Sequence, residues 1–216
     1  MTKITKLYDK AFLTGADDKT EWMLPWFFEN YKKHNKTPII FADFGVTDSK
    51  PIRKYASAIM DLTGLGEKGW FKKPKSMIHA PAKKCIWLDS DCEVKGNLDE
   101  MFDLLNPAKL NMVEDKPWTT RRREEWYNSG VVGYIGKPEI LVKWAKQVEQ
   151  SPKVGDQEVL HEMLDPLLQM AYINPLPPKY NYMRLMIEDY GENPDAKIVH
   201  WTGAKGKDII REQMNG

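Results

Sequence analysis

Nine consecutive residues hold the strongest structural signal in this chain: Lys84-Cys85-Ile86-Trp87-Leu88-Asp89-Ser90-Asp91-Cys92. A short apolar run ends in two carboxylates with one residue between them. Side chains alternate along a strand with period two, so an extended chain places Asp89 and Asp91 on the same face. The apolar part is typical of a strand buried on both faces, as in a parallel sheet.

The position of these two acids suggests a cation site. In open α/β sheets, ligands bind outside the carboxyl ends of the strands. Two carboxylates there are costly unless a cation or hydrogen-bond donors compensate them. A hard divalent cation, Mn²⁺ or Mg²⁺, takes oxygen ligands and commonly carries substrate phosphates as well. A plain pair of surface aspartates is the alternative, and the Asp-x-Asp pattern alone favours neither.

Composition limits the classes of protein that need to be considered. The 216 residues are 42% hydrophobic, which is enough for one domain with a sizeable core. The net charge of +1 gives no reason to expect a nucleic-acid partner. We find no apolar run near the roughly 20 residues that span a bilayer and no signal peptide, so we expect a cytoplasmic protein.

The two cysteines fit the same expectation. If residues 85–92 form one extended strand, Cys85 and Cys92 lie about 20 Å apart, too far for a disulfide. Two free thiols suit a reducing compartment.

The first 45 residues predict a βαβ unit. Residues 10–15 indicate a strand, residues 20–34 a helix and residues 38–45 a second strand, with a right-handed crossover. Asp17 and Asp18 then lie in the loop after the first strand, and Asp43 ends the second. Acids at these positions can accept hydrogen bonds from ribose hydroxyls or base N–H groups. Ordinary turn chemistry explains them equally well.

The remaining residues predict alternating helices and strands. Helices are expected at 49–63, 72–81, 96–105, 138–151 and from 155 onward. Strands are expected at 110–113, 126–135 and 197–200. Loops or irregular segments are expected at 64–69, 116–125, 174–182 and 201–207.

Four short blocks in this order resemble the motifs of one enzyme family. They are Trp87-Leu88-Asp89-Ser90-Asp91, Asn128-Ser129-Gly130, Asp156-Gln157 and His200-Trp201-Thr202-Gly203. The chain is similar to GT-A-fold glycosyltransferases, closest to family 8, the group that contains glycogenin and bacterial galactosyltransferases. The resemblance spans residues 10–207; each block is weak alone, and four in order are strong.

The resemblance implies an α/β fold of the GT-A, Rossmann-like type, with a mixed, mostly parallel central sheet flanked by helices. It implies a single domain over residues 1–216. Residues from 1 to about 105 then form the half that binds a nucleotide-sugar. Residues from about 106 to 216 form the half for the sugar and the acceptor, with a C-terminal metal-binding loop.

The resemblance also assigns roles to residues. Asp89, Asp91 and His200 would ligate Mn²⁺, or Mg²⁺ in its place. The nucleotide and diphosphate would contact a larger set: Asp17, Asp18, Asp43, Ser90, Gly203, and Lys205 or Lys207. Asn128, Asp156 and Gln157 would line the sugar.

The implied reaction is transfer of a hexose from a UDP-sugar, UDP-glucose or UDP-galactose, with retention of configuration. A divalent cation stabilises the negative charge on the departing UDP, an effect of several kcal/mol. Since the residues offer no obvious covalent nucleophile, the resemblance favours front-side attack. Gln157 would then stabilise the cationic sugar in the transition state, with Asp156 the second candidate for close contact.

The acceptor is not identified by the sequence: a glycan, a lipid-linked sugar, a protein or a small molecule all remain open. Trp118, Trp126 and the cluster Arg121–Arg123 are weak candidates for the border of the acceptor site.

One block departs from the family pattern. The family usually has a lysine six residues after the histidine, followed by Pro-Trp. Here position 206 is Gly, with Lys205 and Lys207 on either side, and no Pro-Trp follows. Of the two lysines, we favour Lys205 as the residue that contacts the diphosphate.

Two other functions compete with this interpretation. A haloacid-dehalogenase-type phosphotransferase also places Asp-x-Asp after an apolar strand, but near its N-terminus and not behind two strands and a helix. A degenerate, non-catalytic transferase would bind a sugar or nucleotide, but it has little reason to keep all three metal ligands.

Overall fold

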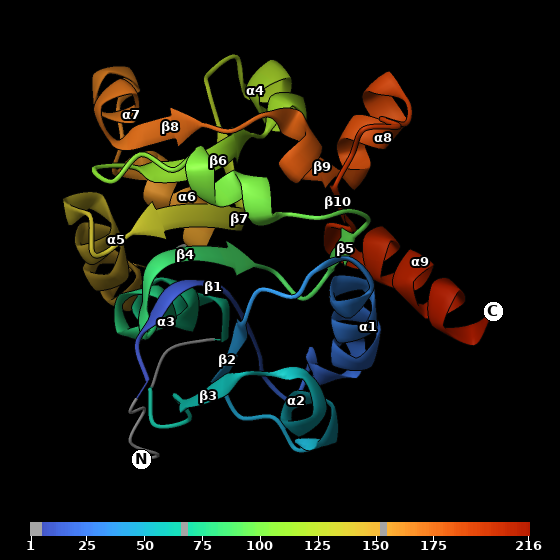
Figure 1. Ribbon diagram of the computed structural model, residues 1–216. Coiled ribbons are helices and arrows are strands. Elements are labelled where there is room, and N and C mark those ends of the chain that lie inside the picture. Colours follow the sequence, from blue (N-terminus) through green and yellow to red (C-terminus); the bar gives the residue numbers. More distant parts are fainter. Residues whose placement is uncertain (1–5, 66–68, 152–154) are drawn as a thin grey trace.

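The computed structural model describes residues 6–65, 69–151 and 155–216. Its centre is a seven-stranded sheet in the order β3-β2-β1-β4-β7-β6-β8 (Figure 1). The strands are β1 (Tyr8–Ala16), β2 (Ile39–Asp43), β3 (Ala58–Asp61), β4 (Ala82–Leu88), β6 (Leu110–Glu114), β7 (Tyr127–Ile135) and β8 (Ile173–Pro175). β7 is antiparallel to both of its neighbours, and the other pairs are parallel. The predicted mixed, mostly parallel sheet is therefore confirmed.

A second, three-stranded sheet has the order β5-β10-β9. It consists of β5 (Cys92–Val94), β9 (Tyr182–Met183) and β10 (Ile198–His200). β10 pairs antiparallel with β5, and His200 lies opposite Cys92. The pairing brings the C-terminal segment to the end of the Asp-x-Asp segment, which passes from the large sheet into the small one.

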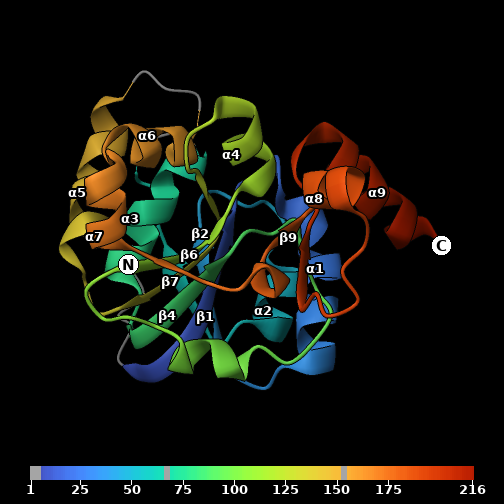
Figure 2. The same cartoon turned by 90° about the horizontal axis from the view of Figure 1, so that it is seen from above.

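Helices cover both faces of the large sheet (Figures 1 and 2). They are α1 (Leu24–His34), α2 (Lys50–Tyr55), α3 (Lys72–His79), α4 (Lys116–Arg122), α5 (Glu139–Gln150), α6 (Asp156–Glu162), α7 (Pro166–Tyr172), α8 (Arg184–Tyr190) and α9 (Gly203–Asn215). β1 shows how the period of two builds two cores: Phe12 packs toward α1, and Leu13 packs toward α3 and α5. None of the described helices is long and apolar enough to cross a membrane.

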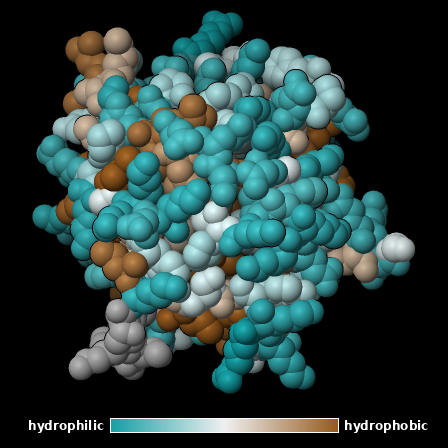
Figure 3. Space-filling model, viewed as in Figure 1, coloured by the Kyte–Doolittle hydropathy of each residue, from teal (hydrophilic) through white to brown (hydrophobic). Residues whose placement is uncertain are grey.

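Apolar side chains are exposed at one corner of the face shown in Figure 3, over α7, and in separate smaller areas elsewhere on that face. Leu167 is 78% exposed and Met170 is 72% exposed there.

The prediction of a helix over 49–63 was wrong beyond Tyr55. The chain becomes extended at Ala56, and Ala58–Asp61 pairs with β2 as an edge strand. The apolar residues Ile59 and Met60 gain more from this pairing and from packing against the sheet than from continuing a helix. The loop expected at 64–69 falls partly on residues 66–68, which lie outside the described residues.

Two predicted loops are in fact helical. Residues 116–122 form α4, because the Asp115 carboxylate accepts from the Trp118 N–H and caps the helix behind Pro117. Residues from 203 onward form α9, and Gly206 lets this helix approach the backbone of Trp201. A Cβ at position 206 would lie 2.1 Å from the Trp201 carbonyl oxygen.

The prediction of one continuous strand over 84–92 was also wrong. β4 ends at Leu88 and β5 begins at Cys92, so Asp89 and Asp91 lie in a connection between two sheets. Cys85 and Cys92 therefore belong to different sheets, and both are free thiols. The segment expected to be irregular at 174–182 contains the ends of two short strands, β8 and β9.

Candidate active site

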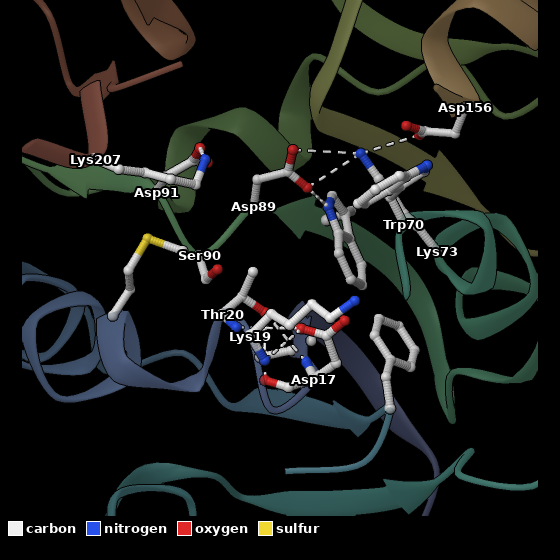
Figure 4. Close-up of a pocket in the computed structure, with 15 residues that line it drawn as sticks. Asp17, Lys19, Thr20, Trp70, Lys73, Asp89, Ser90, Asp91, Asp156 and Lys207 are labelled. Carbon is white, nitrogen blue, oxygen red and sulfur yellow. Dashed lines mark hydrogen bonds and ion pairs between the residues drawn. The ribbon is translucent and has the colours of Figure 1, made fainter. Parts of the chain in front are cut away.

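A pocket of about 200 Å³ opens at the carboxyl ends of β1, β2 and β4 (Figure 4). Its walls come from six separate segments of the chain. The lining residues include Asp17, Thr20, Phe44, Trp70, Lys73, Asp89, Ser90, Asp91, Asp156 and Lys207. This is the edge of the sheet at which open α/β folds bind ligands.

Asp89 faces the large sheet, where it meets a buried cation. The Lys73 ammonium lies 3.1 Å from Asp89 Oδ1 and 3.0 Å from Asp156 Oδ2. It also donates to the carbonyl oxygen of Ser129 at 3.0 Å. Burial alone lowers the pKa of Lys73, but the Asp156 and Asp89 carboxylates outweigh it and hold that pKa above its usual value. Lys73 is therefore a permanent cation between the first acid of Asp-x-Asp and the start of α6.

Asp91 faces the small sheet, where its partners come from the end of the chain. The His200 Nε2 atom lies 3.1 Å from Asp91 Oδ1, and the Lys207 ammonium lies 3.4 Å from Asp91 Oδ2. Burial alone raises the pKa of Asp91, but His200 and Lys207 hold it far below its usual value. Burial likewise lowers the pKa of His200, and Asp91 more than reverses this, so the net pKa is raised.

The Asn-Ser-Gly block of β7 supports the imidazole of His200. A Cβ at Gly130 would lie 2.0 Å from His200 Cε1, so only glycine leaves room for the ring. The His200 Nδ1 atom lies 3.0 Å from Asn181 Oδ1, and Asn181 donates to Asn128 Oδ1 at 2.9 Å. An Nδ1–H donated to Asn181 fixes the tautomer in which Nε2 can bind a cation.

Asp91 and His200 fit a divalent cation. Ligand atoms of Asp91, Cys92 and His200 lie within 4.8 Å of one another. Cys92 is the poorest ligand of the three: burial, together with the Asp91 and Asp89 carboxylates, raises the pKa of its thiol well above the usual value. Hard cations also prefer oxygen and imidazole nitrogen to a protonated thiol. Asp89, predicted as the third ligand, lies outside this group and is paired with Lys73.

A connected set of amides and one acid lies where the sugar was expected. Gln157 Oε1 accepts from Asn128 Nδ2 at 3.0 Å and from the Ser129 N–H at 3.1 Å. Gln157 Nε2 and Asn128 Nδ2 each donate to Asp115 Oδ2 at 3.2 Å. The structure thus joins the predicted residues Asn128 and Gln157 and adds Asp115 to them, whereas Asp156, the neighbour of Gln157 on α6, pairs with Lys73.

The residues predicted at the nucleotide end are divided between the pocket and its surroundings. Asp17 and the buried Ser90 line the pocket, whereas Asp18 is exposed. The Asp17 carboxylate accepts from the Thr20 hydroxyl at 2.8 Å. The Asp43 carboxylate accepts from the N–H groups of Gly45 and Val46, which is ordinary turn chemistry.

Of the two candidate lysines, the structure brings Lys207 and not Lys205 into the pocket. Lys207 contacts Asp91 and lines the cavity, whereas Lys205 is exposed. Their separation follows from the helix that begins at Gly203, since residues two apart on a helix point about 200° apart. Gly203 itself begins α9 with a φ of +74°, a conformation that suits glycine.

Sequence reasoning missed three residues of this site: Lys73, Asp115 and Asn181. Lys73 gave no signal, because a lysine on an amphipathic helix is normally exposed. Asp115 carried a weak signal, since an aspartate followed two residues later by proline is a typical helix start. Asn181 lies in a segment that was expected to be irregular.

The fold and the site together define the class: this is the GT-A fold of glycosyltransferases, and the chain resembles family 8. No family model matches the chain. Galactinol synthase 2 from Ajuga reptans is 24% identical over 156 residues, which are 57% of this chain and 51% of that protein. The chain therefore spans about half the length of this curated relative.

Solved structures agree with the fold. The glycosyltransferase GlyE of Streptococcus pneumoniae matches 96% of this chain and 63% of its own, with a TM-score of 0.66 and 17% identity. The galactosyltransferase LgtC, solved with donor and acceptor sugar analogues, matches 95% of both chains with a TM-score of 0.62 and 14% identity. This architecture is not that of a haloacid-dehalogenase-type phosphotransferase, because the Asp-x-Asp segment follows the fourth strand along the chain, β4, and not a strand near the N-terminus.

Proposed function

We propose that this protein is a metal-dependent, retaining glycosyltransferase that moves a hexose from UDP-glucose or UDP-galactose to an acceptor hydroxyl. The observation that carries the proposal is the contact of Asp91, which lines the pocket, with Lys207 and with the buried His200. Two segments far apart in the sequence build this group. The resemblance to glycosyltransferases supports the proposal, as does the hydrogen-bonded cluster of Asn128, Gln157 and Asp115.

The charges of the pocket suit a nucleotide diphosphate. Asp91 and His200 would hold the divalent cation, with Asp89 as the third candidate ligand, and the bound cation would supply Lewis-acid stabilisation of the leaving diphosphate. The Lys207 ammonium adds a positive charge on the same side, as does the N-terminus of the 13-residue helix α9. Asp17 and Thr20, at the other end of the pocket, offer hydrogen-bonding groups to the nucleoside.

The side chains expected to contact the sugar are held in fixed positions by hydrogen bonds. Gln157 is fixed by Asp115, Asn128 and the Ser129 N–H, so its dipole needs no reorganisation during the reaction. In the proposed front-side transfer, the acceptor hydroxyl attacks the face from which UDP departs, and its proton leaves with the diphosphate. Gln157 stabilises the cationic sugar without bonding to it. The Lys73 ammonium lies against the Asp156 and Asp89 carboxylates beside Gln157.

The test combines binding and turnover. UDP-glucose and UDP-galactose are each added with and without Mn²⁺, and the melting temperature and the release of UDP are measured. We expect a melting temperature raised by Mn²⁺ and one UDP-sugar together, since ligands of the native state stabilise it by mass action. We also expect slow Mn²⁺-dependent hydrolysis of that UDP-sugar.

Gln157→Ala separates catalysis from binding. The variant should lose turnover and keep the wild-type affinity for UDP, and full activity in this variant would contradict the role of Gln157. Binding without any turnover in the wild type would instead identify a non-catalytic sugar- or nucleotide-binding module. Absence of both binding and turnover would reject the whole proposal.

A further inference from the structure

A buried thiol lies beside the candidate metal ligands, and the reaction described above does not use it. Cys92 is fully buried at the start of β5. Its sulfur atom and ligand atoms of Asp91 and His200 lie within 4.8 Å of one another. The Cys92 Sγ atom lies 3.9 Å from the Gly130 carbonyl oxygen, where a thiol makes only a weak hydrogen bond. The thiol therefore gives up little when it turns to a cation.

The pairing of β5 with β10 places Cys92 beside His200. The two residues lie directly opposite each other in this antiparallel pair, where facing side chains have Cβ atoms about 4.5–5.5 Å apart. Adjacent residues of a strand point to opposite faces, but Asp91 lies in the turn before β5. Its carboxylate therefore reaches the same imidazole, with Oδ1 3.1 Å from Nε2. The backbone thus gathers a carboxylate, a thiol and an imidazole.

Asp91 has a pocket side and an inner side. Its Oδ2 atom faces Lys207, which also lines the pocket, and its Oδ1 atom faces the buried His200. A cation held by Asp91 and His200 has two sources for a third protein ligand. Asp89 offers a carboxylate from the pocket side, and Cys92 offers sulfur from the inner side.

The chemistry of the cation decides between these two ligands. Mn²⁺ and Mg²⁺ are hard and favour carboxylate and phosphate oxygen. Zn²⁺ is softer and binds thiolate, imidazole and carboxylate together, usually in tetrahedral geometry. Ligand atoms around a tetrahedral Zn²⁺ lie about 3.5 Å apart, so rotations of the three side chains bring them to the ion.

We infer that Asp91, Cys92 and His200 form an alternative site for a thiophilic divalent cation, Zn²⁺, and that Zn²⁺ bound there inhibits the enzyme. Zn²⁺ replaces the proton of the thiol, which passes to solvent. The binding of Zn²⁺ is independent of the proposed function, whereas its inhibitory effect rests on that function.

Zn²⁺ in this site leaves too few free positions for the donor. Four-coordinate Zn²⁺ with three protein ligands keeps one open position. A cation that bridges two phosphate groups needs two open positions, which a six-coordinate Mn²⁺ or Mg²⁺ offers. Zn²⁺ also occupies Asp91 and His200, so the two kinds of cation exclude each other.

The binding experiment compares the wild type with Cys92→Ala and Cys85→Ala. Both cysteines are fully buried free thiols, and Cys85 lies in the large sheet, so it is the matched control. Calorimetry with Zn²⁺ alone should show about a hundredfold weaker binding in Cys92→Ala and no change in Cys85→Ala. With Mn²⁺ alone, all three proteins should bind equally. Melting temperatures confirm that the variants are folded.

X-ray absorption at the zinc edge tests the site in the wild type without any substitution. The Zn²⁺ complex should show one sulfur at about 2.3 Å, together with nitrogen and oxygen ligands at about 2.0–2.2 Å. Cys85→Ala should keep this sulfur. A shell of nitrogen and oxygen alone in the wild type overturns the inference, as does equal Zn²⁺ affinity of Cys92→Ala and the wild type.

Inhibition is the last readout. One equivalent of Zn²⁺ added with Mn²⁺ should lower UDP release by the wild type at least tenfold, and Cys92→Ala should keep most of its own rate without Zn²⁺. Equal inhibition of both proteins overturns the inhibitory role. If the wild type binds Zn²⁺ through sulfur but neither binds nor hydrolyses a UDP-sugar with Mn²⁺, the Zn²⁺ site stands and the proposed function fails.

Discussion

The two acids of the Asp-x-Asp segment face two differently built regions. Asp89 belongs to the large sheet, where the buried Lys73 neutralises it together with Asp156. Asp91 belongs to the small sheet, where His200 and Lys207 meet it from the C-terminal segment. In the large-sheet region both carboxylates already have a cation of the protein as their partner. In the small-sheet region Asp91 is paired with an imidazole and a partly exposed lysine, and in the proposed function these groups bind a cation and a diphosphate.

The largest expected effect follows from removing the imidazole on the small-sheet side. His200→Ala should lower Mn²⁺-dependent turnover about 10³-fold, which corresponds to about 4 kcal/mol of lost transition-state stabilisation. Turnover of the UDP-sugar and Mn²⁺ affinity by calorimetry measure this. The matched control is His79→Ala, because His79 is exposed on α3 and away from the pocket lining. Undiminished Mn²⁺ affinity in His200→Ala would falsify the assignment of this ligand.

The second effect concerns the large-sheet side and appears in stability. Lys73→Met leaves the Asp89 and Asp156 carboxylates uncompensated, and we expect the free energy of unfolding to fall by about 3–5 kcal/mol. Urea denaturation measures this loss. Lys83→Met removes a comparable ion pair, with Asp9, from the surface and should leave the stability nearly unchanged. Adding Asp156→Asn to Lys73→Met should recover part of the loss. Equal stability of the Lys73→Met and Lys83→Met variants would show that the ion cluster around Lys73 does not stabilise the fold.

The third comparison uses the two lysines of α9. Lys207→Met removes a cation from the pocket and should weaken UDP binding in the presence of Mn²⁺ about tenfold to a hundredfold. Lys205→Met, on the same turn but exposed, should bind UDP as the wild type does. Titration of UDP into each variant decides between them. The reverse result would restore the lysine that the sequence favoured.

Much of the large-sheet region could be predicted from the sequence. The apolar runs of β1, β2, β4 and β7 have the period and length of buried strands. The four motif blocks also predicted that Asp91 and His200 lie together, as they do in the structure, because their chemistry needs particular residue types in a particular order. Their role as metal ligands stays a prediction. These signals are local, so they can be read from a few consecutive residues.

The remaining features depend on contacts between distant segments. Lys73 is buried because Asp89 and Asp156 surround it, and nothing near it in the sequence shows this. Asp89 and Asp91 diverge because the chain passes from one sheet to the other between them. α9 was taken for a loop because glycines at 203 and 206 suggest one, whereas Gly206 is required by the close approach of the helix to Trp201.

The smallest expected effect concerns the side-chain contacts of Glu100, which connect the large-sheet region to the small-sheet region. Glu100 lies in the 3-10 helix Asp99–Asp103 beside β4, and its carboxylate accepts from Tyr180 at 2.6 Å and from Lys179 at 3.0 Å. Lys197, just before β10, lies 3.0 Å away. These contacts, led by the Tyr180 hydroxyl, lower the pKa of Glu100 to about 2.

The sign of the resulting pH dependence follows from this lowered pKa. The folded state holds Glu100 ionised more readily than the unfolded chain does, so its stabilising effect is fully present above about pH 4.5 and is lost as the pH falls through about 2. Glu100→Gln should therefore flatten the fall in stability over this range, measured by urea denaturation at a series of pH values. Glu212→Gln, exposed on α9, should keep the wild-type slope. If both variants keep the wild-type slope of stability against pH, the acid sensitivity arises from other groups, and the contact between the two sheet regions does not depend on the Glu100 carboxylate.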